Sequence, residues 1–142
     1  MSELKDKYIF IIEDDVTNMS VYAVTFKRIG ALVIQDYWNI NTLKLLHSQP
    51  RIDAILLDLN LHYGINGYEI YDQIKAVPAL ADIPVIAVSA ADPTTHISKT
   101  KEKGFAGFIG KPINPFKLPE QVAACLRGEA VWYIPGEQLG DY

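Results

Sequence analysis

The sequence has little cysteine and no long hydrophobic run, and each shortage excludes a class of protein. Cys125 is the single cysteine, which excludes an intramolecular disulfide framework, and we predict that its thiol packs in the core of a protein from a reducing compartment. The longest run without charged residues or breakers, residues 85–91, is far shorter than the ~18–20 residues that span a bilayer. No signal peptide precedes Glu13, so we expect a cytoplasmic protein without membrane contact.

Positive charge is also scarce. The chain carries 13 Lys and Arg against 17 Asp and Glu, which gives a formal net charge of −4. A domain that grips phosphate backbones needs the opposite sign. We therefore expect no direct nucleic-acid partner.

Short apolar runs do occur, and they alternate with longer stretches of helical spacing. The 142 residues, 49% of them hydrophobic, suit a single domain with a sizeable core, which we place at residues 1–128 with a short tail at 129–142. The alternation predicts crossover units and therefore an α/β fold with a parallel sheet. The five predicted strands are residues 8–12, 31–34, 54–57, 84–88 and 105–109.

Apolar residues at helical spacing predict amphipathic helices between and after these strands. The fourth helix, residues 92–103, has only Ile97 as a large apolar residue, so we expect it to be weakly held. The last helix has two alternative starts, because proline suits a first helical turn: Asn114 as the cap with Pro115 behind it, or a later start with Pro119 in that position.

Polar side chains follow four of the predicted strands. In an open parallel sheet, ligands bind beyond the carboxyl ends of the strands, so these side chains would meet in one crevice. They are Glu13, Asp14 and Asp15 after the first strand, Asp58 after the third, Ser89 after the fourth and Lys111 after the fifth.

Taken singly, each of these residues has a structural explanation. Asp14 or Asp15 could cap the helix that follows, Ser89 could be a turn residue, and Lys111 could be a solvated loop residue. Carboxylates gathered at one sheet edge repel one another, however, unless a cation lies among them. Oxygen ligands without His or Cys suit Mg²⁺. A site with Mg²⁺, a lysine and a hydroxyl suits phosphoryl transfer, in which Asp58 would attack in line and become an aspartyl phosphate.

Over roughly residues 8–126 the sequence resembles the receiver domain of two-component response regulators. Four motifs carry the resemblance in the family's order: the acidic cluster in IFIIEDD, the acceptor in ILLDLN, the hydroxyl in IPVIAVSA and the lysine in GFIGKP. The resemblance implies a doubly wound (βα)5 fold of the flavodoxin and CheY type, with a five-stranded parallel sheet in the order 2-1-3-4-5. It further implies a stand-alone phosphoacceptor in a phosphorelay, which is not an enzyme except that it assists its own phosphorylation and dephosphorylation.

The resemblance also implies roles for single residues. Asp58 would accept a phosphoryl group from a histidine kinase or a histidine phosphotransfer protein, while Ser89 and Lys111 act as catalytic contacts to the phosphoryl oxygens. The implied ligands of Mg²⁺ are Asp14 and Asp58 directly, Glu13 through water and the main-chain carbonyl of Asn60.

Phe108 takes the place of the family's switch aromatic, three residues before Lys111. We expect phosphorylation to pull Ser89 toward the phosphoryl group and to let Phe108 turn inward. The signal would pass through the fourth helix, fifth strand and fifth helix to a downstream effector protein or a second copy of this chain. The family commonly holds the peptide bond between Lys111 and Pro112 in the cis form, which we expect here too.

The loop after the acceptor departs from the family pattern. The family usually has a proline four residues after the acceptor and a glycine eight after it, whereas this chain has His62 and Asn66 there, with Gly67 one residue later. The segment LHYGING therefore looks like a one-residue insertion that bears on access to the site. We interpret His62, His47 and His96 as solvated or structural residues rather than ligands.

Three other functions fit parts of the pattern. A flavodoxin-like mononucleotide binder needs a phosphate-cradling loop after the first strand, where the carboxylates of this chain would repel a phosphate. A haloacid-dehalogenase-type phosphatase uses an Asp-x-Asp pair whose first position is Glu13 here. The serious alternative is a pseudo-receiver, which has the same fold and binds a partner without being phosphorylated.

The tail contains an apolar block, Val131, Trp132, Tyr133 and Ile134. Because full exposure of this apolar block to water is unfavourable, we expect it to pack on its own domain or on a second copy in a homodimer. A dangling tail is the alternative.

Overall fold

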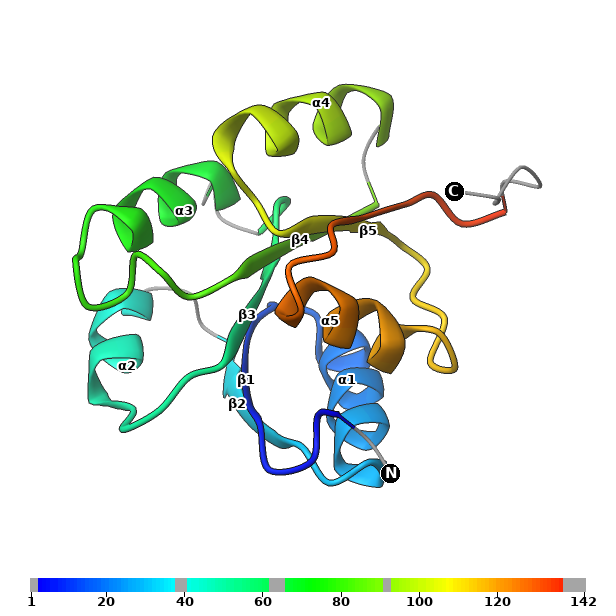
Figure 1. Ribbon diagram of the computed structural model, residues 1–142, viewed down its shortest axis with the longest axis horizontal. Helices are drawn as coiled ribbons and strands as arrows, with labels where there is room; N and C mark the ends of the chain where they lie inside the picture. Colours follow the sequence, from blue (N-terminus) through cyan, green and yellow to red (C-terminus); the bar gives the residue numbers. More distant parts are fainter. Residues whose placement is uncertain (1–2, 38–40, 62–65, 91–92, 137–142) are drawn as a thin grey trace.

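A parallel β-sheet forms the centre of the molecule in the computed structural model, which describes residues 3–37, 41–61, 66–90 and 93–136. The strand order is β2-β1-β3-β4-β5-β6, and every neighbouring pair is parallel (Figure 1). The strands are β1 (Tyr8–Ile12), β2 (Leu32–Asp36), β3 (Ala54–Asp58), β4 (Val85–Ser89), β5 (Gly107–Gly110) and β6 (Val131–Tyr133). The first five confirm the predicted order 2-1-3-4-5, and β6 corrects the predicted number of strands from five to six.

Helices cover both faces of the sheet. α1 and α5 share one hydrophobic core with the sheet, and residues from α2, α3 and α4 pack into the core on the other face (Figure 1). Every residue of β3, β4 and β5 is buried, as expected for strands covered on both sides. The helices are α1 (Val16–Arg28), α2 (Thr42–Ser48), α3 (Gly67–Lys75), α4 (Pro93–Lys103) and α5 (Leu118–Leu126).

Two predicted strands differ from the observed ones by two residues at one end. The fifth was expected from Phe105, but the Phe105 N–H donates to the carbonyl of Thr100 and so closes α4, and ladder pairing with β4 starts only at Gly107. The second was expected to end at residue 34, but Gln35 and Asp36 continue the pairing with β1. Polar residues can extend β2 because it forms an edge of the sheet.

The structure shows how firmly α4 is held and where α5 begins, the two points that the sequence left open. Within the described residues of α4, Thr100 is the buried one and Ile97 packs at the margin of the core, which confirms a weakly anchored helix. The later start of α5 is correct, with Pro119 in its first turn. Asn114 instead holds the preceding turn, where its side-chain Oδ1 accepts from the N–H groups of Phe116 and Lys117.

The apolar part of the tail packs on its own domain. Val131 and Tyr133 contact the core on the α1 and α5 side, while Trp132 contacts the core on the opposite face. Cys125 is buried as predicted, and burial raises the pKa of its thiol to about 11. No helix in the described part of the chain combines the length and apolar character needed to cross a membrane.

Candidate functional site

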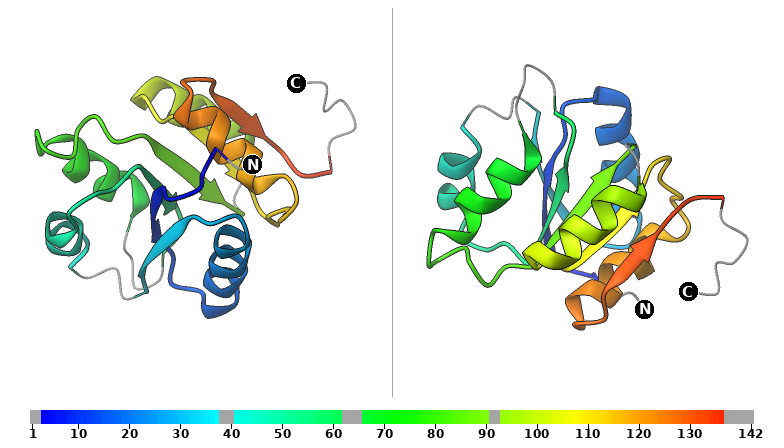
Figure 2. Two further views of the ribbon diagram at one scale, coloured as in Figure 1. Left: turned by 60° about the horizontal axis from the view of Figure 1, so that its bottom comes forward. Right: turned by 90° about the horizontal axis from the view of Figure 1, so that it is seen from above.

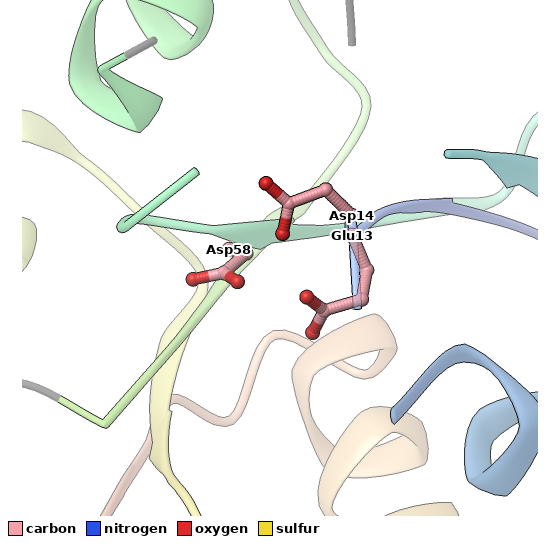
Figure 3. A group of neighbouring side chains, drawn as sticks. All are labelled: Glu13, Asp14 and Asp58. Atoms are coloured by element: carbon pink, nitrogen blue, oxygen red, sulfur yellow. The ribbon is translucent and has the colours of Figure 1, made fainter. Parts of the chain in front are cut away.

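The carboxyl ends of β1 and β3 bring three carboxylates together. Glu13 and Asp14 directly follow β1, and Asp58 is the last residue of β3. One oxygen from each of these side chains lies within 4.8 Å of the others, and Figure 3 shows the three carboxylates turned toward one another. These three side chains therefore meet at the carboxyl edge of the sheet, as their positions after the strands predict.

Lys111 connects this acidic group to β5. Its Nζ donates to Glu13 Oε1 at 2.9 Å and to Asp58 Oδ2 at 3.0 Å, and its main-chain N–H donates to the carbonyl of Ser89 at 2.9 Å. Burial by itself lowers the pKa of Lys111, but the charges of Asp58 and Glu13 more than offset this, so the pKa is raised. The ammonium is thus held charged beside Asp58. The peptide bond that follows, between Lys111 and Pro112, is cis as predicted.

Asn60 orients both the acceptor and the hydroxyl. Its main-chain N–H donates to Asp58 Oδ1 at 2.9 Å, and its side-chain Nδ2 donates to Ser89 Oγ at 3.0 Å. The sequence pointed only to the carbonyl of Asn60, as a metal ligand. The side-chain contact was missed because it joins residues 29 positions apart.

Glu13 is the most deeply buried member of the acidic group, with 1% of its surface exposed. Burial raises its pKa to about 7; the charge of Asp58 adds to this, and Lys111 opposes it. The same two carboxylates, together with burial, raise the pKa of the Tyr22 phenol on α1. Sequence reasoning missed Tyr22, which reads as an ordinary core residue on its helix.

The donor set fits a hard divalent cation. Its ligand atoms are carboxylate oxygens alone, and Asp14 is only half-buried, which leaves a side open to water. The ammonium of Lys111 offsets only part of the negative charge of the three carboxylates, and a bound cation would offset more of it. Asp15 does not belong to the group, because its side chain caps α1 by accepting from the Asn18 N–H at 2.9 Å.

The segment after Asp58 returns to the site through Gly67. A Cβ at Gly67 would lie 2.6 Å from the carbonyl oxygen of Asp58 and 2.7 Å from Leu59 Cα, so only glycine fits. Asn66 caps α3 by accepting from the Tyr68 N–H at 2.8 Å. The late glycine thus packs against the acceptor's backbone. His62 and the centre of the inserted loop, residues 62–65, lie outside the described residues.

Phe108 lies in an aromatic group that the sequence did not reveal. Its ring is fully buried and stacks with His96 of α4, with centroids 6.4 Å apart. His96 also stacks with Tyr68, whose hydroxyl lies 2.6 Å from His96 Nδ1. Phe108 is therefore already buried in this structure, and its inward turn on phosphorylation stays a prediction. His96 is a packing residue between α3, α4 and β5, as its structural interpretation implied.

The fold and site together define a parallel α/β domain with an acidic phosphoacceptor-type pocket, and sequence comparison identifies the family. The family model described as the response regulator receiver domain matches residues 9–123. The chain belongs to this family. It therefore contains the receiver domain of a two-component response regulator.

Among named relatives, the two-component response regulator ORR11 of Oryza sativa subsp. indica is 34% identical over 108 residues, which cover 76% of this chain and 73% of the relative. The polar-differentiation response regulator DivK of Brucella anthropi is 28% identical over 120 residues, covering 84% and 96%. The chain spans only 51% of the rice regulator ORR7 and 63% of ORR5.

Solved structures show the same fold. The signal receiver domain of a DNA-binding response regulator from Colwellia psychrerythraea is 29% identical, with a TM-score of 0.74, and the match covers 86% of this chain and 99% of that one. The chemotaxis regulator CheY4 of Vibrio cholerae is 17% identical, with a TM-score of 0.76 and coverage of 85% and 99%.

Proposed function

We propose that the protein is a cytoplasmic phosphoacceptor, in which Asp58 receives a phosphoryl group from a phosphohistidine donor of a two-component system. The position of Lys111 carries the proposal. Its ammonium lies within 3.0 Å of both the acceptor carboxylate and Glu13, which is where the charge of an incoming phosphoryl group would need to be balanced.

The transfer needs few groups from the protein. A carboxylate oxygen of Asp58 attacks the phosphorus, the new O–P bond replaces the P–N bond of the donor, and the electron pair of that bond returns to the imidazole nitrogen. Lys111 then pairs with a phosphoryl oxygen, and the hydroxyl of Ser89 donates to another. Asn60 orients Asp58 and Ser89 for these roles.

Mg²⁺ in the acidic group would neutralise charge on the phosphoryl oxygens during transfer. The carboxylates of Asp14 and Asp58 would hold the ion directly and Glu13 through water, and the main-chain carbonyl of Asn60 would complete the protein ligands. The mutual distances of the three carboxylates support this assignment.

Phosphorylation of the purified chain tests the acceptor. Incubation with Mg²⁺ and acetyl phosphate should add the mass of one phosphoryl group, and Asp58→Asn should abolish the gain because an amide is a poor nucleophile. Asp15→Asn is the matched control, since Asn also caps helices and Asp15 lies outside the acidic group. If the wild-type chain gained no mass, the pseudo-receiver would be favoured. If Asp58→Asn gained as much mass as the wild type, another residue would be the acceptor.

An apolar groove between α1 and the start of α5 suits the donor protein. It has a volume of about 600 Å³ and is lined by residues of α1 and by the segment before and into α5, including Val24 and Phe116. These side chains are 58% and 86% exposed, which is unusual for large apolar groups. A donor must approach the carboxyl edge of the sheet to reach Asp58, and α1 begins two residues after Asp14. We assign the groove to a helix of the phosphohistidine donor.

Phe116→Ala should therefore slow phosphotransfer from a protein donor about tenfold, the usual cost of truncating an aromatic interface residue. Labelling by acetyl phosphate should stay unchanged, because the small donor needs no docking surface. The donor used is the phosphorylated kinase or phosphotransfer protein that labels the wild-type chain fastest. Leu32→Ala, on the far edge strand and 43% exposed, is the control. The docking assignment would be refuted if Phe116→Ala slowed labelling equally with both donors, or if it slowed labelling with neither donor.

A further inference from the structure

The strand β6 covers the outer edge of β5. The two strands pair in parallel, with Trp132 opposite Phe108 at the centre of the register. Figure 2 shows β6, the orange-red arrow, at the end of the sheet beside α5. All four residues of β5 are buried, so without β6 a fully apolar strand would form the edge of the sheet. Such an edge is a template for another strand.

Two glycines leave room on β5 for this cover. A Cβ at Gly107 would lie 2.8 Å from the carbonyl oxygen of Val131, and a Cβ at Gly110 would lie 2.7 Å from Pro135 Cδ. Both distances are shorter than side chains tolerate. The edge of β5 is therefore shaped to accept an extended chain over residues 131–135.

The flanking helices add side-chain contacts on both faces. Trp132 packs into the core on the α3 and α4 side, and Lys101 Nζ lies 5.1 Å from the centre of its ring. Tyr133 packs into the opposite core, with Lys117 Nζ 5.2 Å from its ring. Successive residues of β6 thus enter two separate sites on opposite faces of the sheet, each with a cation over an aromatic ring. The edge of β5 therefore binds side chains on both faces of the strand that pairs with it.

Strand β6 is held less firmly than the other strands. It has three residues, and none of them is fully buried. Residues 127–130 join it to α5, and Gly128 within this connection has a φ of 88°. Short, half-buried edge strands open locally at lower free energy than the core of a domain.

We propose that the outer edge of β5 is a strand-docking site, and that residues 131–135 fill it from within the same chain. The ligand is an extended apolar and aromatic segment, and when the chain's own strand leaves, the C-terminal segment of a second copy takes its place by β-augmentation. The receiver family match ends at residue 123, before this feature. The proposal does not depend on phosphorylation of Asp58.

Competition with a synthetic peptide tests the site in the full-length chain. The probe is a fluorescent peptide of residues 128–136, and the double variant Trp132→Ala with Tyr133→Ala weakens the chain's own strand. This variant should bind the peptide at least tenfold more tightly than the wild-type chain, whose site is filled. Adding Gly110→Ala should remove binding, because the new Cβ occupies the place of Pro135. Circular dichroism confirms that each variant is folded.

Two results would overturn the proposal. One is equal peptide affinity of the wild-type chain and the double variant; the other is undiminished binding after Gly110→Ala. Hydrogen exchange on the wild-type chain is an independent measurement that requires no variant. The amides of residues 131–133 should exchange at least tenfold faster than those of β3, and equal protection would show that the cover does not open. Both experiments are done without Mg²⁺ or a phosphodonor, so failure of the proposed phosphorylation leaves their outcome unaffected.

Discussion

Asp58 is held from two sides by residues that follow different strands, Lys111 after β5 and Asn60 after β3. Lys111 Nζ bonds to its Oδ2, and the main-chain N–H of Asn60 bonds to its Oδ1. Gly67 adds a third constraint, because α3 starts in contact with the acceptor's own backbone. These contacts hold Asp58 in position at the sheet edge, where its side chain is buried.

Gly67→Ala should lower the free energy of unfolding by about 1–3 kcal/mol, the usual cost of overpacking a rigid contact. It should also slow labelling of Asp58, since the new Cβ would push on the acceptor's carbonyl oxygen. Gly128→Ala is the control: it has open space around it, but its positive φ costs about 1–2 kcal/mol. Urea denaturation and acetyl phosphate labelling measure both effects. Equal labelling rates in the two variants would contradict the role assigned to Gly67.

Among the helices, α4 has the fewest buried residues in the described part of the chain. It is held by the burial of Thr100, by the contact of His96 with Tyr68, and by the hydroxyl of Tyr71, which donates to the Lys103 carbonyl. The helix follows Ser89, which the Lys111 N–H connects to the end of β5. A movement of either residue toward a phosphoryl group would therefore reach α4 first.

Beryllofluoride, as a mimic of the phosphoryl group, should change amide exchange across residues 89–118, most strongly in α4. The physical reason is that few contacts oppose a shift of this helix, so a gap of a few kcal/mol can separate two arrangements. Exchange in α2 serves as the internal control, because α2 packs against α3 and follows β2, which lies at the opposite end of the sheet from β5. Identical exchange with and without the mimic, at verified occupancy, would show that α4 does not carry the signal.

The acidic site also affects the stability of the molecule as a whole. Burial raises the pKa of Glu13 to about 7, whereas an exposed glutamate has a pKa near 4.5. Below 4.5 the residue is protonated in both the folded and unfolded chain. As the pH rises from 4.5 to about 7, the unfolded chain gives up this proton first, so folding stability falls; well above 7 both states are ionised and the contribution stays constant. A bound cation reverses the trend because it favours the ionised carboxylate.

In a metal-free buffer, raising the pH from 5 to 8 should therefore destabilise the wild-type chain relative to Glu13→Gln. The difference should be on the order of 1 kcal/mol, because one pKa unit corresponds to about 1.4 kcal/mol and screening by Lys111 and water reduces the effect. Mg²⁺ should stabilise the wild-type chain more at pH 8 than at pH 5. Urea denaturation measures both trends, and Glu102→Gln, at an exposed position of α4, should behave like the wild type. A pH dependence that is the same in Glu13→Gln would refute this account of Glu13.

Local patterns in the sequence were sufficient for the five strands of the family fold and for the residues at their ends. A parallel strand buried on both faces leaves an uninterrupted apolar run, and the polar residue that ends it must lie at the carboxyl edge. Asp58, Ser89 and Lys111 were predictable for this reason. Boundaries were less predictable, because the end of β2 and the start of β5 depend on which backbone groups find partners in neighbouring elements.

Contacts between distant segments were decided only by the tertiary structure. The bond from Asn60 to Ser89, the stack of His96 on Phe108 and the packing of Gly67 under Asp58 each join residues from separate elements, and no local pattern encodes their approach. The apolar block at residues 131–134 showed that the tail needed cover, but not where it would find it. Only the folded sheet, with a free edge at β5 and glycines that leave room there, determined that the block becomes a sixth strand.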